Sequence, residues 1–293
     1  MLISSSANRL LKEKSTIVLN GKLIDLATPK IMGILNVGAN SFYDGGEYLN
    51  ADAIAKRVHQ MHAEGVDIID IGAVSTRPGA DQPSPKEELK CLIPAVKIVR
   101  ELYPEIPISI DTYRSWVVHR VVDEIGAVIV NDISGGRFDE QMFSTVAKLQ
   151  VPYILMHLAG KDNGNIHETP QYTDIIKEVT KFFSDRVRKL HALGVKDVIL
   201  DPGFGFGKTI DNNYTLLNSL DAFKVFQLPI LAGMSRKSMF YKLMESTPDE
   251  CLPATISANT LALLSGANIL RVHDVKETKQ CIAIFNKLKD LAE

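Results

Sequence analysis

The sequence predicts an α/β fold, a (β/α)8 or TIM barrel preceded by a β-hairpin, and three observations support this. Short apolar runs rich in Ile and Val alternate with longer amphipathic stretches. Several runs are apolar at successive positions, which is typical of parallel strands covered on both faces. Glycine follows the amphipathic stretches and precedes the next apolar run, at Gly65, Gly126, Gly194 and Gly266.

A hairpin is expected at residues 16–26, where Asn20-Gly21 interrupts an alternation of apolar and polar residues. Asn-Gly is strongly preferred in two-residue hairpin turns. The barrel is expected to follow over about residues 30–290, with the hairpin capping one end. Its eight strands are predicted at 31–36, 68–71, 106–111, 128–131, 153–157, 198–201, 230–232 and 269–272.

Helices are expected where apolar residues recur with a period near 3.6 and charges occupy the other side. These stretches are 51–63, 86–102, 116–125, 175–193 and 253–264. Eight strand–helix units favour the closed barrel. A doubly wound open sheet is the alternative, but no GxGxxG follows the first strand. Because no linker or low-complexity tract interrupts this pattern, we expect one domain over residues 1–293.

The composition narrows the class of protein. The chain has 293 residues, 45% of them hydrophobic and 23% charged, with a formal net charge of −2. That charge gives no reason to expect a nucleic acid or an anionic membrane as a partner. No run reaches the roughly 20 apolar residues of a membrane helix, and the N-terminus lacks a secretory signal. The three cysteines, Cys91, Cys251 and Cys281, show no CxxC spacing, so free thiols in the cytoplasm are expected.

Three polar residues stand in the same context, each at the end of a short apolar run: Asp111, Asn131 and Asp201. For one of them alone, capping a helix or closing a turn is the simpler interpretation. Because the carboxyl ends of parallel strands meet at one end of a barrel, three together favour a ligand pocket. Two carboxylates and an amide match a flat heterocycle with several N–H donors, such as a pterin or a purine.

The segment DPGFGFGK, residues 201–208, is rich in Gly and Phe. Glycines allow the backbone to approach a ligand closely, and Phe204 and Phe206 are candidates to line an aromatic ligand. The segment lacks the GxxxxGK[ST] spacing, which excludes a nucleotide phosphate loop.

Two basic segments follow the last two predicted strands. GMSRKS carries Arg236 and Lys237, and its position favours contact with an anion or a substrate over a solvated turn. In RVHDVKET, Arg271 and His273 alternate and therefore share one side of the strand. Loops after the seventh and eighth strands frequently bind phosphate in such barrels.

Other strand ends supply further candidates. Arg77, presented by the Pro78-Gly79 turn, is a second candidate anion ligand. Asn36 ends the first barrel strand and is a candidate ligand for Mg²⁺, which binds through few protein oxygens. His157 ends the fifth strand and is a candidate to line the pocket.

Successive segments of the chain resemble the signatures of the dihydropteroate synthases, in that family's order. They are GILNV, SFYDGG, GAVSTRPGA, SIDT, NDISG, MH, LDPGFGFGK, GMSRKS and RVHDVKET. The resemblance implies a usually dimeric TIM-barrel transferase of folate biosynthesis, which is the target of sulfonamides. Such an enzyme uses Mg²⁺ and joins 7,8-dihydropterin-CH₂-diphosphate to p-aminobenzoate, giving 7,8-dihydropteroate and diphosphate.

Carried over position by position, the resemblance implies three groups of residues. The pterin would contact Asp111, Asn131, Asp201, Lys237 and Arg271, of which all except Asn131 would also be catalytic. Diphosphate would contact Asn36, Arg77, Arg271 and His273, with Asn36 also holding Mg²⁺. Thr76, Pro78, Phe206 and Ser235 would border p-aminobenzoate. The expected reaction breaks the C–O bond with SN1 character, and the acids stabilise the pterin cation.

The chain departs from the family pattern in its first loop. The family usually reads NVTPDSF, whereas Gly38, Ala39 and Asn40 replace Thr, Pro and Asp here, and Val74 stands at a common Glu position. We expect weaker catalysis or altered binding of p-aminobenzoate or sulfonamides. A catalytically silent pterin-binding paralogue is therefore one alternative. The other is a pterin-dependent methyltransferase, which would not need the diphosphate ligands.

Overall fold

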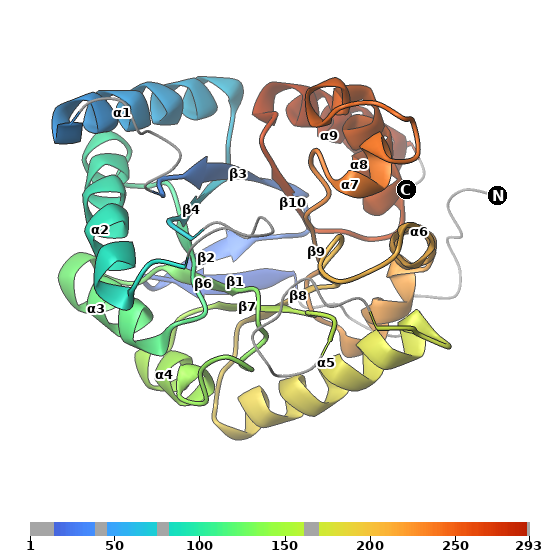
Figure 1. Cartoon of the computed structure of the whole chain (residues 1–293), viewed down its shortest axis with the longest axis horizontal. Coiled ribbons are helices and arrows are strands. Elements are labelled where there is room, and N and C mark those ends of the chain that lie inside the picture. The colour runs from blue at the N-terminus through green and yellow to red at the C-terminus, as the bar shows by residue number, and fades with distance from the viewer. Residues whose placement is uncertain (1–14, 39–45, 75–81, 161–169, 292–293) are drawn as a thin grey trace.

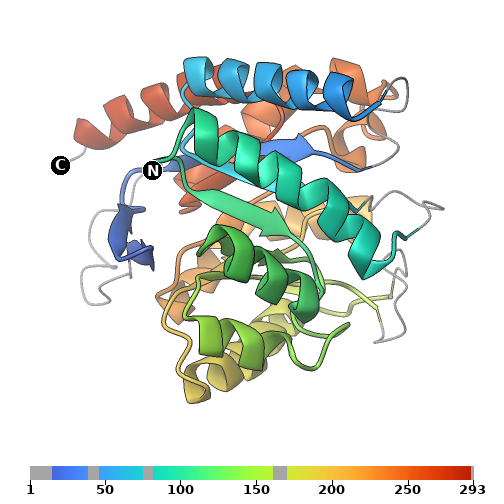
Figure 2. The same ribbon diagram turned by 90° about the vertical axis from the view of Figure 1, so that its left-hand side faces the viewer.

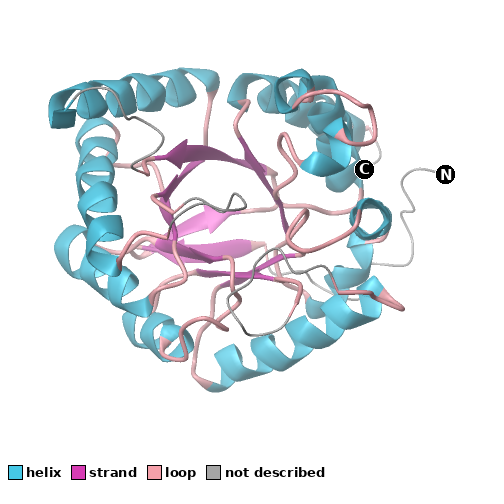
Figure 3. Cartoon of the chain, viewed as in Figure 1, coloured by secondary structure: helices cyan, strands magenta, loops and turns pink. Residues whose placement is uncertain are grey.

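The computed structural model is a barrel of parallel strands enclosed by helices, and it describes residues 15–38, 46–74, 82–160 and 170–291, with only the backbone of 46–50. Figure 3 shows the strands at the centre and the helices around them. In the described part, the main sheet has the strand order β8-β7-β6-β5-β4-β3-β10-β9. The strands are β3 (Lys30–Asn36), β4 (Ile68–Gly72), β5 (Ile108–Asp111), β6 (Ile129–Asp132), β7 (Tyr153–Met156), β8 (Val198–Asp201), β9 (Leu231–Ala232) and β10 (Ile269–Val272).

The two ends of this sheet meet, which makes it a barrel. Leu200 of β8 forms a parallel bridge with Ile230, the residue before β9. The Leu200 amide donates to the carbonyl of Pro229 at 2.8 Å. The predicted (β/α)8 architecture is therefore confirmed, and the doubly wound open sheet is excluded. All eight strands stand where the sequence predicted them, with ends shifted by at most two residues.

A ring of helices covers the outside of the barrel, as Figure 1 shows. The five predicted helices are present, although α1 begins five residues before the predicted start at 51. Four further helices of the described chain, α4, α6, α7 and α9, were not predicted. The helices are α1 (Gly46–Glu64), α2 (Pro85–Leu102), α3 (Ser115–Ile125), α4 (Met142–Leu149), α5 (Ile175–Ala192), α6 (Ile210–Asn218), α7 (Ser238–Tyr241), α8 (Leu252–Leu264) and α9 (Val275–Asp290), with 3₁₀ turns η2 (Leu220–Phe226) and η3 (Pro248–Glu250). None of the described helices is long and apolar enough to span a membrane.

Local sequence explains several helix ends. The Ser84 hydroxyl accepts from the Glu87 amide at 3.3 Å, and Glu87 accepts from the Ser84 amide at 2.7 Å, which is a capping box. Gly65 follows α1 with φ +89°, and the other three predicted stop glycines also have positive φ. Such a left-handed residue satisfies the last helical carbonyls, and glycine adopts it without a Cβ clash.

The hairpin closes the amino-terminal end of the barrel. Its strands β1 (Thr16–Leu19) and β2 (Lys22–Asp25) pair antiparallel and lie at the left-hand end of the barrel in Figure 2. Ile17 and Leu26 are fully buried against an inner layer of strand residues. That layer consists of Met32, Ile68, Ile129, Ile154, Ile199, Leu231 and Ile269. The amino-terminal end is thus apolar and plugged, which leaves the carboxyl end for polar chemistry.

Candidate functional site

The three predicted strand-end residues come together at the carboxyl end of the barrel. Asp111 and Asn131 are neighbours in the β5–β6 register, and Asp201 ends β8, two strands further along. Asn131 and Asp201 stand two positions after inner-layer isoleucines of their own strands. Because strand side chains alternate, both face the barrel interior. Asn131 is 3% exposed and Asp201 6% exposed.

Arg271 links two carboxylates at this end of the barrel. Its Nη2 donates to Asp111 Oδ2 at 2.8 Å, and its Nε donates to Asp70 Oδ2 at 2.7 Å. Asn131 Nδ2 also donates to Asp70 Oδ2, at 3.2 Å. The fully buried Asp70 thus holds two of the predicted pterin ligands in place. Asp70 was not predicted as a site residue, although its place two positions after Ile68 on the same strand puts it on the inward-facing side of β4.

The acids and bases of this cluster shift one another's pKa values. Burial is the main cause that raises the pKa of Asp111 to about 7, and the Arg271 guanidinium opposes the shift. Burial likewise raises the pKa of Asp201. Burial and then Arg271 lower the pKa of Lys237 to about 8. The carboxylates keep the pKa of Arg271 above its usual value despite burial, so its charge is permanent.

An apolar wall stands beside these polar groups. Ile133, Met156 and Leu158 form a small buried cluster against which Tyr113, Phe138 and Phe206 pack. Lys237 Nζ lies 4.2 Å from the centre of the Phe206 ring, a cation–π distance. A polar floor with an apolar aromatic wall is the surface that a flat, polar-edged heterocycle requires.

One buried lysine, Lys208, holds the loop after β8. Lys208 Nζ donates to the carbonyls of Gly203, His157 and Phe206 at 2.6, 3.1 and 3.3 Å. Gly203 has φ +69°, and a Cβ there would lie 2.0 Å from the His157 carbonyl oxygen. The Gly203 amide donates to Asp201 Oδ1 at 2.7 Å. The loop sequence therefore serves close backbone packing that fixes the Asp201 carboxylate.

Two candidates suggested by the sequence do not line this pocket. Phe204 is 1% exposed and belongs to the large core cluster of the barrel, unlike Phe206. The His157 ring packs edge-on against Phe182 of α5, with ring centroids 4.9 Å apart. His157 follows β7 in the register that faces the helices, because Ile154 and Met156 take the inward positions. Burial holds the pKa of His157 well below its usual value.

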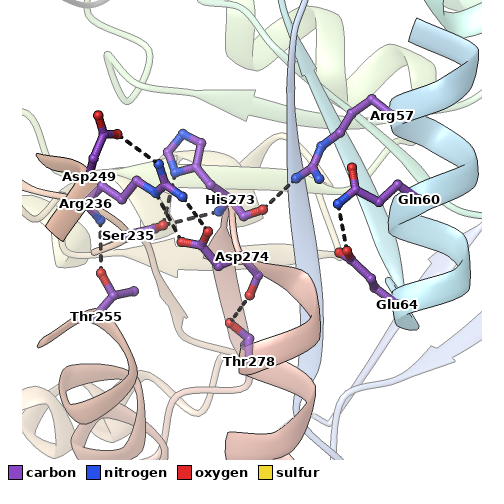
Figure 4. A network of polar contacts seen from close by, with 10 residues as sticks. All are labelled: Arg57, Gln60, Glu64, Ser235, Arg236, Asp249, Thr255, His273, Asp274 and Thr278. Carbon is purple, nitrogen blue, oxygen red and sulfur yellow. Dashed lines mark hydrogen bonds and ion pairs between the residues drawn. The ribbon is translucent and has the colours of Figure 1, made fainter. Parts of the chain in front are cut away.

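The loops after β9 and β10 are joined by the polar network in Figure 4. Arg236 donates to both carboxylate oxygens of Asp274 and to Asp249. Its amide donates to Thr255 Oγ1 at 3.2 Å. Of the two basic residues in GMSRKS, Lys237 therefore belongs to the cluster and Arg236 braces the two loops. The expected contact with an anion or a substrate therefore stays a prediction for Lys237, whereas the Arg236 guanidinium already donates to the carboxylates of Asp274 and Asp249.

His273 and Asn36 stand at the same end of the barrel. Ser235 Oγ lies 3.0 Å from His273 Nδ1, and burial and then Arg271 lower the pKa of His273 to about 4. Asn36 ends β3 with an exposed side chain. Among the described residues no group of three or more His, Cys, Asp or Glu is placed to hold a metal ion. One amide oxygen from Asn36 still suits Mg²⁺, which commonly keeps several waters and substrate phosphates as ligands.

Part of the predicted site lies outside the described residues. This applies to Thr76, Arg77 and Pro78, and to Ala39 and Asn40 of the first loop. Gly38 is described, and a Cβ placed there would lie 2.7 Å from the Ala73 carbonyl oxygen. The backbone at Gly38 therefore packs against the strand end that precedes Val74, which links the two departures from the family pattern.

Three comparisons place the chain among known proteins. A family model described as "Pterin binding enzyme" matches residues 32–273. A dihydropteroate synthase of Escherichia coli (strain K12) is 39% identical over 266 residues, covering 90% of this chain and 93% of that protein. The Xanthomonas albilineans dihydropteroate synthase solved with 4-aminobenzoic acid has a TM-score of 0.85 at 33% identity, covering 94% of this chain and 98% of that one. The Yersinia pestis enzyme solved with a sulfonamide also has a TM-score of 0.85, at 35% identity, covering 94% and 99%.

A TIM barrel with acidic, amide and basic side chains gathered at the carboxyl ends of its strands belongs to the class of barrel enzymes whose active site lies at that face. Within that class, this chain belongs to the pterin binding enzyme family. The resemblance to dihydropteroate synthases that the sequence motifs indicated is confirmed.

Proposed function

We propose that this protein is a transferase of folate biosynthesis that joins 7,8-dihydropterin-CH₂-diphosphate to p-aminobenzoate, giving 7,8-dihydropteroate and diphosphate. Its similarity to dihydropteroate synthases along most of its length supports this reaction. The observation that carries the proposal is the cluster of Asp111, Asn131, Asp201 and Arg271 around the buried Asp70.

The pterin is proposed to lie on this cluster. The carboxylates of Asp111 and Asp201 accept hydrogen bonds from its N–H groups, and Asn131 supplies both a donor and an acceptor. Lys237 donates to the heterocycle from beside Phe206, and Arg271 packs its planar guanidinium against the ring. The wall at Ile133, Met156 and Leu158 covers the apolar part of the ring.

The diphosphate is proposed to lie between β3 and β10. Arg271, His273 and Arg77 donate to its oxygens, and Asn36 would hold Mg²⁺ through its side-chain oxygen. When bound, Mg²⁺ stabilises negative charge on the leaving oxygens. Thr76, Pro78, Phe206 and Ser235 border the p-aminobenzoate, and sulfonamides, as arylamines of similar shape, compete for that place.

The chemistry requires no covalent enzyme intermediate. The bond between the pterin methylene carbon and the diphosphate oxygen breaks, and both bonding electrons leave with the diphosphate. Asp111 and Asp201 stabilise the resulting cation from a site that excludes much of the water. The arylamine nitrogen then forms the new C–N bond and loses a proton.

Turnover of the purified chain tests the proposal. We expect release of diphosphate that depends on both substrates, and Asp201→Asn should lower kcat/KM by a factor of roughly 100. Asp185→Asn, an exposed isosteric change on α5, is the matched control. Binding of the pterin diphosphate without turnover would support a silent pterin-binding protein instead. Methyl transfer from methyl-tetrahydrofolate would support the methyltransferase.

We further propose a single domain, a homodimer and a cytoplasmic location. The hairpin packs into the barrel core, which supports one domain. Exposed apolar side chains on α8 and α9, namely Leu261, Ile284 and Leu288, support a dimer, because a two-fold interface pairs the same face of both subunits. Cys91, Cys251 and Cys281 are free thiols, as expected in a reducing compartment. Sedimentation of Ile284→Glu against the unchanged protein tests the dimer, and a monomer in both would exclude it.

A further inference from the structure

The Ser235 hydroxyl contacts two different atoms of His273. Ser235 Oγ accepts from the His273 backbone amide at 3.2 Å and lies 3.0 Å from the ring Nδ1. Ser235 is 6% exposed, so its hydroxyl has little access to water. In the described part of the chain this Oγ contacts no other hydrogen-bonding group. Ser235 and His273 come from different loops, after β9 and after β10.

These contacts decide where the protons lie. An amide N–H can only donate, so it occupies a lone pair of Ser235 Oγ. The hydroxyl hydrogen then needs an acceptor, because a buried donor left unpaired costs about 1–3 kcal/mol. Nδ1 is the acceptor within reach. A neutral imidazole that accepts at Nδ1 carries its proton on Nε2.

The backbone of His273 is held independently of its ring. Arg57 of α1 donates from Nη2 to the His273 carbonyl, and the pair of Arg236 with Asp274 anchors the next residue. Figure 4 shows these contacts on the two sides of His273. With the backbone held in this way, the rotation of the ring and its tautomer are what remains for Ser235 to set.

We propose that Ser235 is a positioning residue that fixes His273 as the neutral tautomer protonated on Nε2, so that the ring donates this hydrogen to an oxygen of the departing diphosphate. This inference rests on the proposed function. It gives Ser235 a task beyond bordering p-aminobenzoate. The two tasks are compatible. The contacts with His273 use the hydroxyl hydrogen and one lone pair of Ser235 Oγ, which leaves the Cβ methylene group for the proposed contact with the arylamine.

The electrostatic surroundings agree with a neutral ring. Within the described part of the chain, Arg271, Arg236 and Arg57 act on His273 as positive charges and Asp274 acts on it as a negative charge. Burial and these arginines lower the pKa of His273 to about 4, so the ring is neutral at pH 7. A neutral ring has one donor nitrogen, and the tautomer therefore decides whether His273 can donate to an anion at all.

Nitrogen-15 NMR of histidine-labelled protein tests the tautomer directly. His273→Gln assigns the signal among the seven histidines. We expect an unprotonated Nδ1 and a protonated Nε2 in the unchanged protein at pH 7. Ser235→Ala should move both shifts towards the average of two exchanging tautomers, and Ser235→Thr, which keeps the hydroxyl, should restore them. A protonated Nδ1 in the unchanged protein would overturn the proposal.

Kinetics test the consequence of the tautomer. Ser235→Ala should lower kcat about tenfold and weaken inhibition by inorganic diphosphate by a similar factor, as loss of one hydrogen bond to a charged group predicts. The KM for the arylamine should change less. The matched control is Ser257→Ala on α8, whose hydroxyl bonds only within its helix, and it should change none of these values. A rise in arylamine KM alone would assign Ser235 to the p-aminobenzoate site and reject the positioning role.

The two readouts separate this inference from the proposed function. The NMR result does not require turnover, so a chain without synthase activity still shows or lacks the Nε2 tautomer. Full turnover in Ser235→Ala, with unchanged diphosphate inhibition, rejects the positioning role while the synthase reaction stands. Equal unfolding midpoints in urea for both serine variants exclude a folding defect as the cause.

Discussion

At the level of single residues, Asp70 organises the candidate site although it was not among the predicted site residues. One of its carboxylate oxygens accepts from both Arg271 and Asn131, and the other has no partner in the described protein. A carboxylate buried in this position fixes the orientation of both the Arg271 guanidinium and the Asn131 amide. Without it, Arg271 would be held by Asp111 alone.

We therefore predict that Asp70→Asn weakens both stability and pterin binding. Removing one member of a buried ion pair costs about 3–5 kcal/mol, and about 2 kcal/mol is expected here because Arg271 keeps Asp111. The KM for the pterin diphosphate should rise about tenfold. Urea unfolding and steady-state kinetics measure the two effects. Asp185→Asn is the control, and a pterin KM equal to that of the unchanged protein would show that Arg271 does not need Asp70.

Asp111 makes the stability of the protein depend on pH. Burial raises its folded pKa to about 7, above the ordinary value of 3.8. Between these two values the folded state binds more protons than the unfolded state, so the free energy of unfolding falls as pH rises from about 4 to about 7. Above about pH 7 Asp111 is ionised in both the folded and the unfolded state. Its contribution to the free energy of unfolding therefore no longer changes with pH.

The corresponding prediction concerns Asp111→Asn. An amide does not titrate, so the decline in the free energy of unfolding between pH 5 and pH 7 should become shallower. Urea unfolding at pH 5, 6, 7 and 8 measures this slope, and Asp185→Asn should keep the original slope. An unchanged slope in Asp111→Asn would assign the raised pKa to another group.

At the level of elements, the loops after the strands are fixed by contacts between neighbouring loops. Lys208 binds carbonyls from the β7 and β8 loops, and Arg236 joins the β9 and β10 loops. In both cases one basic side chain satisfies several carbonyl or carboxylate oxygens. The conformation of these loops therefore depends on contacts with the neighbouring loop as well as on their own sequences.

Lys208→Met is expected to lower the free energy of unfolding by about 3 kcal/mol or more, because three carbonyls lose their donor. Loss of the contact between Lys208 and the Phe206 carbonyl should also displace Phe206. This displacement should raise the KM for p-aminobenzoate more than the KM for the pterin. Kinetics with each substrate varied in turn, together with urea unfolding, test both statements. Lys181→Met, on the exposed side of α5, is the control. Equal stability in the two variants would show that the carbonyls find other donors.

The first loop gives a second prediction at this level. Gly38→Thr would place a Cβ 2.7 Å from the Ala73 oxygen, so the single change should cost about 1–3 kcal/mol. Gly233→Ala, where the nearest atom would lie 3.7 Å away, is the control. Combining Gly38→Thr with Ala39→Pro and Asn40→Asp restores the family pattern and should raise kcat. Equal kcat in the triple variant would show that the departures do not limit turnover.

At the level of the whole molecule, the barrel separates stability from chemistry along its axis. The hairpin plugs the amino-terminal end with Ile17, Leu19 and Leu26. The titratable cluster occupies the carboxyl end, beyond the inner apolar layer. Changes at the plug are therefore expected to alter folding and leave substrate contacts in place.

Ile17→Ala tests this separation. The loss of a fully buried side chain should cost about 2–4 kcal/mol, while the KM values change less than twofold. The neighbouring Val18→Ala is the control, because Val18 is 42% exposed and should cost under about 1 kcal/mol. Urea unfolding and kinetics on the same samples decide the matter. A marked rise in KM would show that the plug also shapes the active face.

Much of the architecture could be predicted because strand and helix periodicity are local. The strand ends at Asp111, Asn131 and Asp201 were found from apolar runs that a parallel sheet requires. The helices α4 and α6 escaped prediction because they are short and carry few periodic positions. Phe204 and His157 were assigned to the pocket because sequence distance alone does not reveal on which side of a strand or loop a ring packs.

By itself, the sequence determined the barrel, its closing hairpin, the active face and the chemical type of the strand-end residues. Only the tertiary structure decided that Asp70 holds Arg271 and Asn131, that Lys208 braces a loop, and that Ser235 holds His273. Asp70 and Arg271 are 201 residues apart along the chain, and Ser235 and His273 are 38 apart. The physical reason is that hydrogen bonds depend on ångström distances, which arise only when the strands close into a ring and bring remote residues side by side.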